Sequence, residues 1–147
     1  MSSLVSEPLV RLYAVVYVLL GLKMAAVGNY TSILRLRRKI FATPEDYALQ
    51  GMAPRTTRDE DIERTRRAHQ NDVENIPLFW ALGFVFLMTY PPLVAAEIYL
   101  VGFLLARTAH SIFYIRSMQP HRTIAFALGG VLTLAMAVHT LIAVLRS

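Results

Sequence analysis

The chain alternates between long helix-length stretches and short polar connections. Four such stretches cover residues 9–34, 63–89, 93–114 and 123–145. About twenty predominantly apolar residues in helical conformation cross the hydrocarbon core of a bilayer. Lys23 and Asn29 interrupt the first stretch, and the first half of the second is strongly polar. The pattern predicts an all-α integral membrane protein, a four-helix bundle formed by one domain over residues 1–147.

The connections carry most of the positive charge. Nine of the fifteen Lys and Arg residues lie between Arg35 and Arg67, and Arg116 and Arg122 flank the third connection. The turn at residues 90–92 carries no charge. Because basic connections remain on the cytoplasmic side, both termini are predicted on the non-cytoplasmic side. The host membrane is either a bacterial inner membrane or the endoplasmic reticulum.

Composition narrows the class of protein. The chain has 147 residues, is 55% hydrophobic and has a formal net charge of +5, with a mean hydropathy of +0.44. Phospholipid headgroups are better counterions than nucleic acid for basic residues that flank apolar spans, so we expect no nucleic-acid partner. There are no cysteines, which excludes a disulfide or a thiol nucleophile from the chain itself. No cleavable signal is evident, and we expect no metal site.

The first connection contains its own helix signal. Thr43 can cap a helix, Pro44 fits the first helical position, and Glu45 and Asp46 suit the first turn. Asp46 is therefore first interpreted as a residue that complements the helix dipole.

Residues 63–75 form the most polar segment of any predicted span. At about 100° per residue, one face of this helix carries five polar residues. They are Arg64, Arg67, Asn71, Glu74 and Asn75. Ionisable groups that share a face inside a membrane indicate a functional site. The alternative is an interfacial helix whose arginines extend to phosphates, which explains the arginines but not Asn71 and Glu74.

Polar residues from three spans are predicted at similar depth. With a rise of 1.5 Å per residue, they form one layer on the cytoplasmic side. The members are Lys23, Asp72, Glu74, Arg107 and His110. For Lys23 and Asp72 we favour mutual neutralisation that lets the bundle pack. Residues 107, 110, 111 and 114 share a face of the third span because they are spaced by three and four.

Four motifs together resemble a known family. The segment ERTRRAHQNDVENI, with RLRRKIFATPED at 35–46, ARTAHSIFY at 106–114 and QPHRTIAF at 119–126, is similar to the MAPEG family of membrane-associated glutathione and eicosanoid proteins. The resemblance covers nearly the whole chain. It implies a four-helix protomer, a homotrimer, and glutathione bound between subunits near the cytoplasmic face.

The resemblance also implies a set of site residues. Glutathione-contacting positions are matched by Arg35, Arg67, Asn71, Glu74, Arg107, His110, Tyr114 and Arg122, and Ser111 shares their face on the third span. Glu74 suits the ammonium of glutathione, and Arg35, Arg67 and Arg107 suit its carboxylates. Arg122, at the start of the fourth span, is expected beside the sulfur, where Thr123 adds a hydroxyl. With Asp46, which matches a carboxylate of the prostaglandin synthase branch, these two are the catalytic candidates.

The resemblance implies a glutathione transferase or peroxidase that acts on hydrophobic electrophiles or lipid hydroperoxides. In the synthase branch an Arg usually stands where this chain has Gln70, and a Tyr where it has Phe126. Both departures favour the transferase branch. The alternatives are a glutathione-dependent prostaglandin isomerase, a non-catalytic lipid-binding scaffold and, less favoured, a small-molecule exporter.

Overall fold

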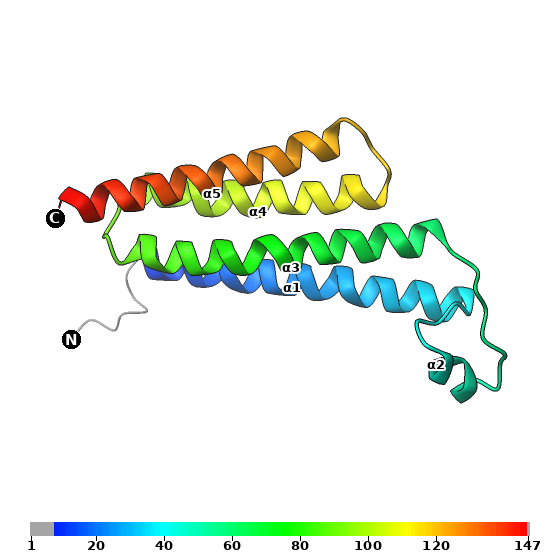
Figure 1. The fold of residues 1–147 in the computed structure, drawn as a ribbon. Coiled ribbons are helices and arrows are strands. Elements are labelled where there is room, and N and C mark those ends of the chain that lie inside the picture. Colours follow the sequence, from blue (N-terminus) through cyan, green and yellow to red (C-terminus); the bar gives the residue numbers. More distant parts are fainter. Residues whose placement is uncertain (1–7, 147) are drawn as a thin grey trace.

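The computed structural model describes residues 8–146 and is helical throughout its ordered elements. Within these residues, four long helices and one short helix follow one another, and Figure 1 shows their arrangement. They are α1 (Pro8–Arg38), α2 (Pro44–Leu49), α3 (Glu60–Leu87), α4 (Leu93–Ile115) and α5 (His121–Arg146). The all-α class predicted from the hydropathy pattern is confirmed, and no strand occurs among these residues.

The long helices run alongside one another as two pairs. α1 packs on α3, and α4 packs on α5, while α4 also contacts α1 and α3 (Figure 1). The connection that holds α2 and the turn between α4 and α5 lie at one end of the bundle. The start of α1, the turn between α3 and α4 and the end of α5 lie at the other. The most basic segments of the chain therefore share one end.

The bundle core is built from apolar side chains of the four long helices. The rings of Phe79 and Phe103 stack with centroids 3.6 Å apart, which joins α3 to α4. Near the end of α3, Gly83 leaves room for the ring of Tyr13 on α1. The Tyr13 hydroxyl donates a hydrogen bond of 2.8 Å to the backbone carbonyl of Trp80. These contacts fix α1, α3 and α4 relative to one another below the polar layer.

The outside of the bundle is largely apolar. Three described helices are long and apolar enough to cross a membrane, namely α1, α4 and α5. α3 is 28 residues long and continues through Pro77, but its polar first half keeps it outside this set. Exposed Leu, Ile, Val and Phe side chains cover the outer faces of the long helices. Such a surface is stable against lipid chains and unfavourable in water.

The connection between α1 and α3 is tied down by polar contacts. The Thr43 hydroxyl accepts a hydrogen bond of 3.4 Å from the Asp46 N–H, as the predicted helix start required. Asp59 caps α3 by accepting from the N–H groups of Asp61 and Ile62, each at 3.0 Å. Arg38 pairs with Asp59 and, at 2.6 Å, with Asp61. The Arg38 hydrogen bond and the backbone N–H of Ile62 lower the pKa of Asp59 below its ordinary value.

Candidate functional site

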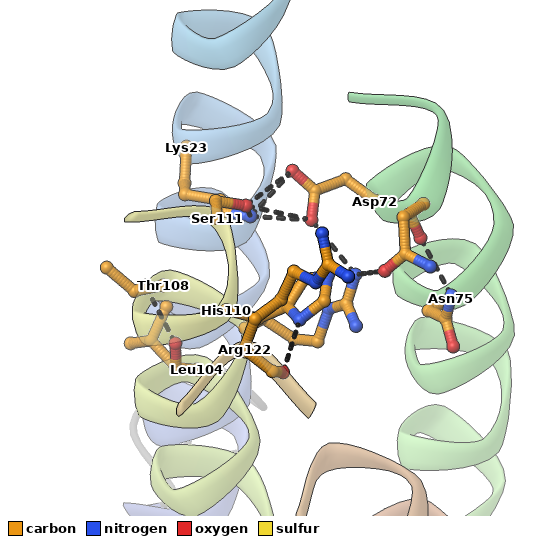
Figure 2. Close-up of polar contacts among 10 residues, drawn as sticks. Lys23, Asp72, Asn75, Leu104, Thr108, His110, Ser111 and Arg122 are labelled. Carbon is orange, nitrogen blue, oxygen red and sulfur yellow. Dashed lines mark hydrogen bonds and ion pairs between the residues drawn. The ribbon is translucent and has the colours of Figure 1, made fainter. Parts of the chain in front are cut away.

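A carboxylate lies at the centre of the bundle. Asp72 follows Ala68 and precedes Ile76 by four residues, so it shares the buried face of α3 and is 0% exposed. Lys23 of α1 donates to both of its oxygens, at 2.5 and 2.6 Å (Figure 2). Arg107 of α4 donates to Asp72 Oδ1 at 3.2 Å. The preferred interpretation of Lys23 and Asp72 as a neutralising pair is confirmed by this geometry.

The same network includes two neutral side chains. Lys23 Nζ lies 2.5 Å from Ser111 Oγ, and Ser111 donates to Asp72 Oδ2 at 3.3 Å. Arg107, which is 1% exposed, also donates from Nη2 to the side-chain oxygen of Asn71. Two cations thus surround one carboxylate, and the buried cluster carries one positive charge in excess. We refer to Lys23, Asn71, Asp72, Arg107 and Ser111 as the core cluster.

A second polar group joins α4 to the start of α5. His110 Nδ1 lies 3.1 Å from the backbone carbonyl of Arg122 (Figure 2). Because a carbonyl only accepts, Nδ1 carries a proton and donates to it. His110 Nε2 is buried and has no hydrogen-bond partner among the described residues. His110 is 3% exposed. Its ring also meets the edge of the Tyr114 ring, with centroids 5.6 Å apart.

The guanidinium of Arg122 is positioned from two sides. Its Cζ lies 4.4 Å from the centroid of the Tyr114 ring, in cation–π geometry. Gln119 satisfies both neighbours when its amide oxygen accepts from Arg122 Nε at 3.0 Å and its nitrogen donates to Thr123 Oγ1 at 2.9 Å. We refer to His110, Tyr114, Gln119, Arg122 and Thr123 as the α5 cluster. Since Arg107 and His110 are three residues apart on α4, the two clusters are adjacent.

Two further candidates lie on the outer face of α3. Arg67 and Glu74 are both exposed in the protomer. Gln70, a neutral side chain, donates to Glu74 Oε1 at 3.2 Å. Within residues 8–146, Arg67 makes no ion pair. Arg64, by contrast, forms two ion pairs within α3, with Glu60 at 2.8 Å and with Asp61 at 3.0 Å.

The remaining two candidates line one cleft beside α2. Arg35 and Asp46 contribute to a cavity of about 310 Å³ between the end of α1 and α2, together with Phe41 and Leu36. The Asp46 side chain is exposed and Arg35 is half-buried. The predicted residues therefore occupy four places: the core cluster, the α5 cluster, the outer face of α3 and the α2 cleft.

Some expectations change with this geometry. Lys23 and Arg107 both pair with Asp72. Glu74, expected at the same depth, is exposed and contacts neither cation. Arg107 Nη2 and the Ser111 hydroxyl bind inside the protomer, where Nη2 holds Asp72 and Asn71. Arg107 Nε is buried without a partner among the described residues. Gln119 was not singled out from the sequence, although its spacing of three from Arg122 and four from Thr123 at a helix start is a signal for such contacts.

Comparison with known proteins identifies the family. The MAPEG family profile matches residues 13–142. Microsomal glutathione S-transferase 1 from Sus scrofa is 40% identical over 120 residues, which cover 78% of this chain and 77% of that protein. Prostaglandin E synthase from Homo sapiens is 35% identical over 141 residues, covering 95% of this chain and 93% of that protein. The chain is therefore an integral membrane protein that belongs to the MAPEG family.

Proposed function

We propose that this protein is a membrane-bound glutathione transferase, with peroxidase activity toward lipid hydroperoxides. It would activate the glutathione thiolate for attack on hydrophobic electrophiles dissolved in the bilayer. The similarity to microsomal glutathione S-transferase 1 supports the reaction class, and the apolar outer surface supports a substrate that arrives through lipid.

The observation that carries the proposal is the division of charges on α3. Asp72 is satisfied inside the bundle by Lys23 and Arg107. Arg67 and Glu74 are exposed and make no ion pair within the described chain. Glutathione carries two carboxylates and one ammonium, so a ligand of this charge pattern supplies what Arg67 and Glu74 lack. Arg35 and the amide of Asn71 add further donors for its oxygens.

Arg122 is the proposed stabiliser of the sulfur. Tyr114 and Gln119 hold its guanidinium in place. The backbone N–H groups of Arg122 and Ile124 already donate to Met118 and Pro120 at 3.1 Å. The side chain, helped by the positive end of α5, therefore supplies most of the stabilisation. Lowering the pKa of the glutathione thiol raises the fraction of nucleophile at neutral pH, and the Thr123 hydroxyl is a second donor.

The two reactions follow from the thiolate. With a chlorodinitrobenzene-type electrophile, the thiol proton passes to solvent, a C–S bond forms, and chloride leaves with the electrons of the broken C–Cl bond. With a hydroperoxide, the thiolate attacks the terminal oxygen to form a sulfenic acid, the O–O bond breaks, and the alkoxide leaves and takes a proton from solvent to give the alcohol. A second glutathione then converts the sulfenic acid to the disulfide and water.

The direct test is activity of the purified protein. Glutathione with chlorodinitrobenzene, and separately with a lipid hydroperoxide, should react faster than the detergent blank. Arg66→Lys serves as a matched control, since Arg66 is exposed and pairs with Glu63 at 2.9 Å away from the site. No rate above the blank with several electrophiles and hydroperoxides would refute the proposal.

The proposal includes a topology and an assembly. We propose that α3 is a fourth membrane span, that the single domain covers the whole chain, and that both termini lie on the non-cytoplasmic side. Arg67 and Glu74 would then face lipid in a lone protomer, at high cost. A homotrimer that covers this face with a second copy, and binds glutathione between subunits, removes that cost. Native mass spectrometry that finds only active monomers in mild detergent would contradict this assembly.

Two alternative functions, an isomerase and a lipid-binding scaffold, can be tested separately. The similarity to human prostaglandin E synthase favours an isomerase, in which Asp46 would be the carboxylate. Phe126, however, lies with its ring 5.7 Å from the His110 ring and has no hydroxyl. A prostaglandin endoperoxide isomerised faster than chlorodinitrobenzene is conjugated would favour this alternative. A lipid-binding scaffold would bind fatty acid but not glutathione in calorimetric titration.

A further inference from the structure

The side-chain amide of Asn71 has only one orientation that satisfies its neighbour. Arg107 Nη2 donates to Asn71 Oδ1. A guanidinium has five donors and no acceptor, so the amide atom that faces it must be the oxygen. The amide nitrogen, with its two donors, therefore faces away from Arg107. Asn71 is half-buried and lies one helical turn from Arg67 and Glu74, so a ligand bound on that face can reach its N–H groups.

Arg107 is itself fixed by the buried carboxylate. Asp72 accepts from Arg107 Nη2 at 3.2 Å and from Lys23 at 2.5 and 2.6 Å. Arg107 and Asp72 are 1% and 0% exposed, so water does not compete for these contacts. A second contact steadies the helix at this point, where Asn75 Nδ2 donates to the Asn71 backbone carbonyl at 2.7 Å (Figure 2).

We propose that Asp72 and Arg107 are positioning residues that hold Asn71 as a hydrogen-bond donor toward the ligand. Neither touches the ligand, and both act through the Asn71 amide. The site then selects a carboxylate or carbonyl oxygen at this place and rejects a group that donates. This inference rests on the proposed function for the identity of the ligand, glutathione, but not for the orientation of Asn71.

The excess positive charge of the core cluster makes Asn71→Asp an informative substitution. Lys23 and Arg107 face one carboxylate, which leaves one positive charge in excess. Asn71→Asp neutralises that excess and keeps an acceptor for Arg107, but it removes the donors that face the ligand. Asn71→Leu removes both the acceptor and the donors. A bystander Asn71 would make Asn71→Asp neutral for binding, whereas our proposal predicts that both variants weaken glutathione binding and that Asn71→Asp is the milder one for stability.

The first measurement needs no ligand. The unfolding midpoint in detergent should be at or above the wild-type value for Asn71→Asp, and below it for Asn71→Leu. If Asn71→Asp loses as much as Asn71→Leu, Arg107 does not hold this amide and the inference is overturned.

The second measurement uses glutathione. Removing a hydrogen bond to a charged partner should raise the KM for glutathione about tenfold or more in Asn71→Asp, with kcat little changed. Lys is shorter than Arg and places its nitrogen nearer the α4 backbone than Arg107 Nη2, so Arg107→Lys should release Asn71, raise the KM in the wild-type background and add nothing in the Asn71→Ala background. The control Arg66→Lys should change neither. Equal losses of kcat from Arg107→Lys in both backgrounds would indicate a purely structural role and overturn the inference.

Separate measurements test glutathione binding and the hold of Arg107 on the Asn71 amide. A wild-type protein that binds no glutathione in calorimetry refutes the proposed function. The stability comparison of Asn71→Asp with Asn71→Leu still supports or overturns the hold on the amide in that case.

Discussion

The guanidinium of Arg122 lies over the ring of Tyr114, with its Cζ 4.4 Å from the ring centroid. This contact uses the face of the ring and not the hydroxyl. Tyr114→Phe should therefore keep the position of Arg122, while Tyr114→Leu should release it. A cation–π contact is worth about 0.5–1 kcal/mol at a partly exposed site, so kcat/KM in Tyr114→Leu should fall severalfold. A loss in Tyr114→Phe as large as in Tyr114→Leu would mean that the hydroxyl, and not the ring face, is the functional feature.

Glu74 should recognise the ammonium of glutathione. Its only described partner is the neutral Gln70, so its charge is free to pair with a ligand. Glu74→Gln should raise the KM for glutathione by about tenfold, since a hydrogen bond to a charged group contributes about 1.5–3 kcal/mol. The deciding comparison uses a glutathione analogue without the amino group. Wild type and Glu74→Gln should bind this analogue equally, and a persistent difference would place Glu74 at another part of the ligand.

The core cluster predicts an asymmetry between its charges. Asp72→Leu leaves Lys23 and Arg107 without a carboxylate, whereas Lys23→Met leaves Asp72 paired with Arg107. Removing one partner of a buried ion pair typically costs about 3–5 kcal/mol, so Asp72→Leu should lose stability on that scale. Lys23→Met should lose clearly less. The free energy of unfolding in mixed detergent micelles measures both, and an equal loss would mean that Arg107 does not compensate Asp72.

Asp59 should make the stability of the folded protein decrease at low pH. The Arg38 hydrogen bond lowers its folded pKa below the ordinary value of 3.8. Its contribution is therefore complete above pH 4 and is lost as the pH falls through the folded pKa. Asp59→Asn keeps a capping oxygen but loses this ionisation. The difference in unfolding midpoint between wild type and Asp59→Asn should shrink as the pH falls below 4, and a constant difference would exclude the ion pair as its origin.

The sequence predicted the helices well because each signal was local. A capping hydroxyl at Thr43, an apolar period, and basic residues at the ends of apolar stretches depend only on neighbours along the chain. α3 was harder, since its first half is polar by composition but packs Thr65, Ala68 and Asp72 inward. Burial of that face depends on Lys23 and Arg107, which come from other helices.

The candidate site was predictable as a set but not in its arrangement. Helical spacing correctly grouped Arg67, Asn71 and Glu74 on one face. It could not show that Arg107 would turn inward to Asp72, because that choice depends on the depth and rotation of α3 relative to α4. The match of charge between Lys23 and Asp72 was foreseen from depth alone. The hold of Gln119 on Arg122 depends on the local geometry where α5 begins.

The central claim is that Arg122 stabilises the thiolate of bound glutathione, and the near-ultraviolet thiolate band measures this directly. Titration against pH of wild type saturated with glutathione should show a thiol pKa below that of free glutathione. Arg122→Leu should raise this pKa while leaving glutathione affinity largely intact, each unit corresponding to about 1.4 kcal/mol of lost stabilisation. Glu74→Gln should instead weaken binding and leave the pKa of the bound thiol unchanged. An unchanged thiol pKa in Arg122→Leu, with a raised one in Glu74→Gln, would contradict the account.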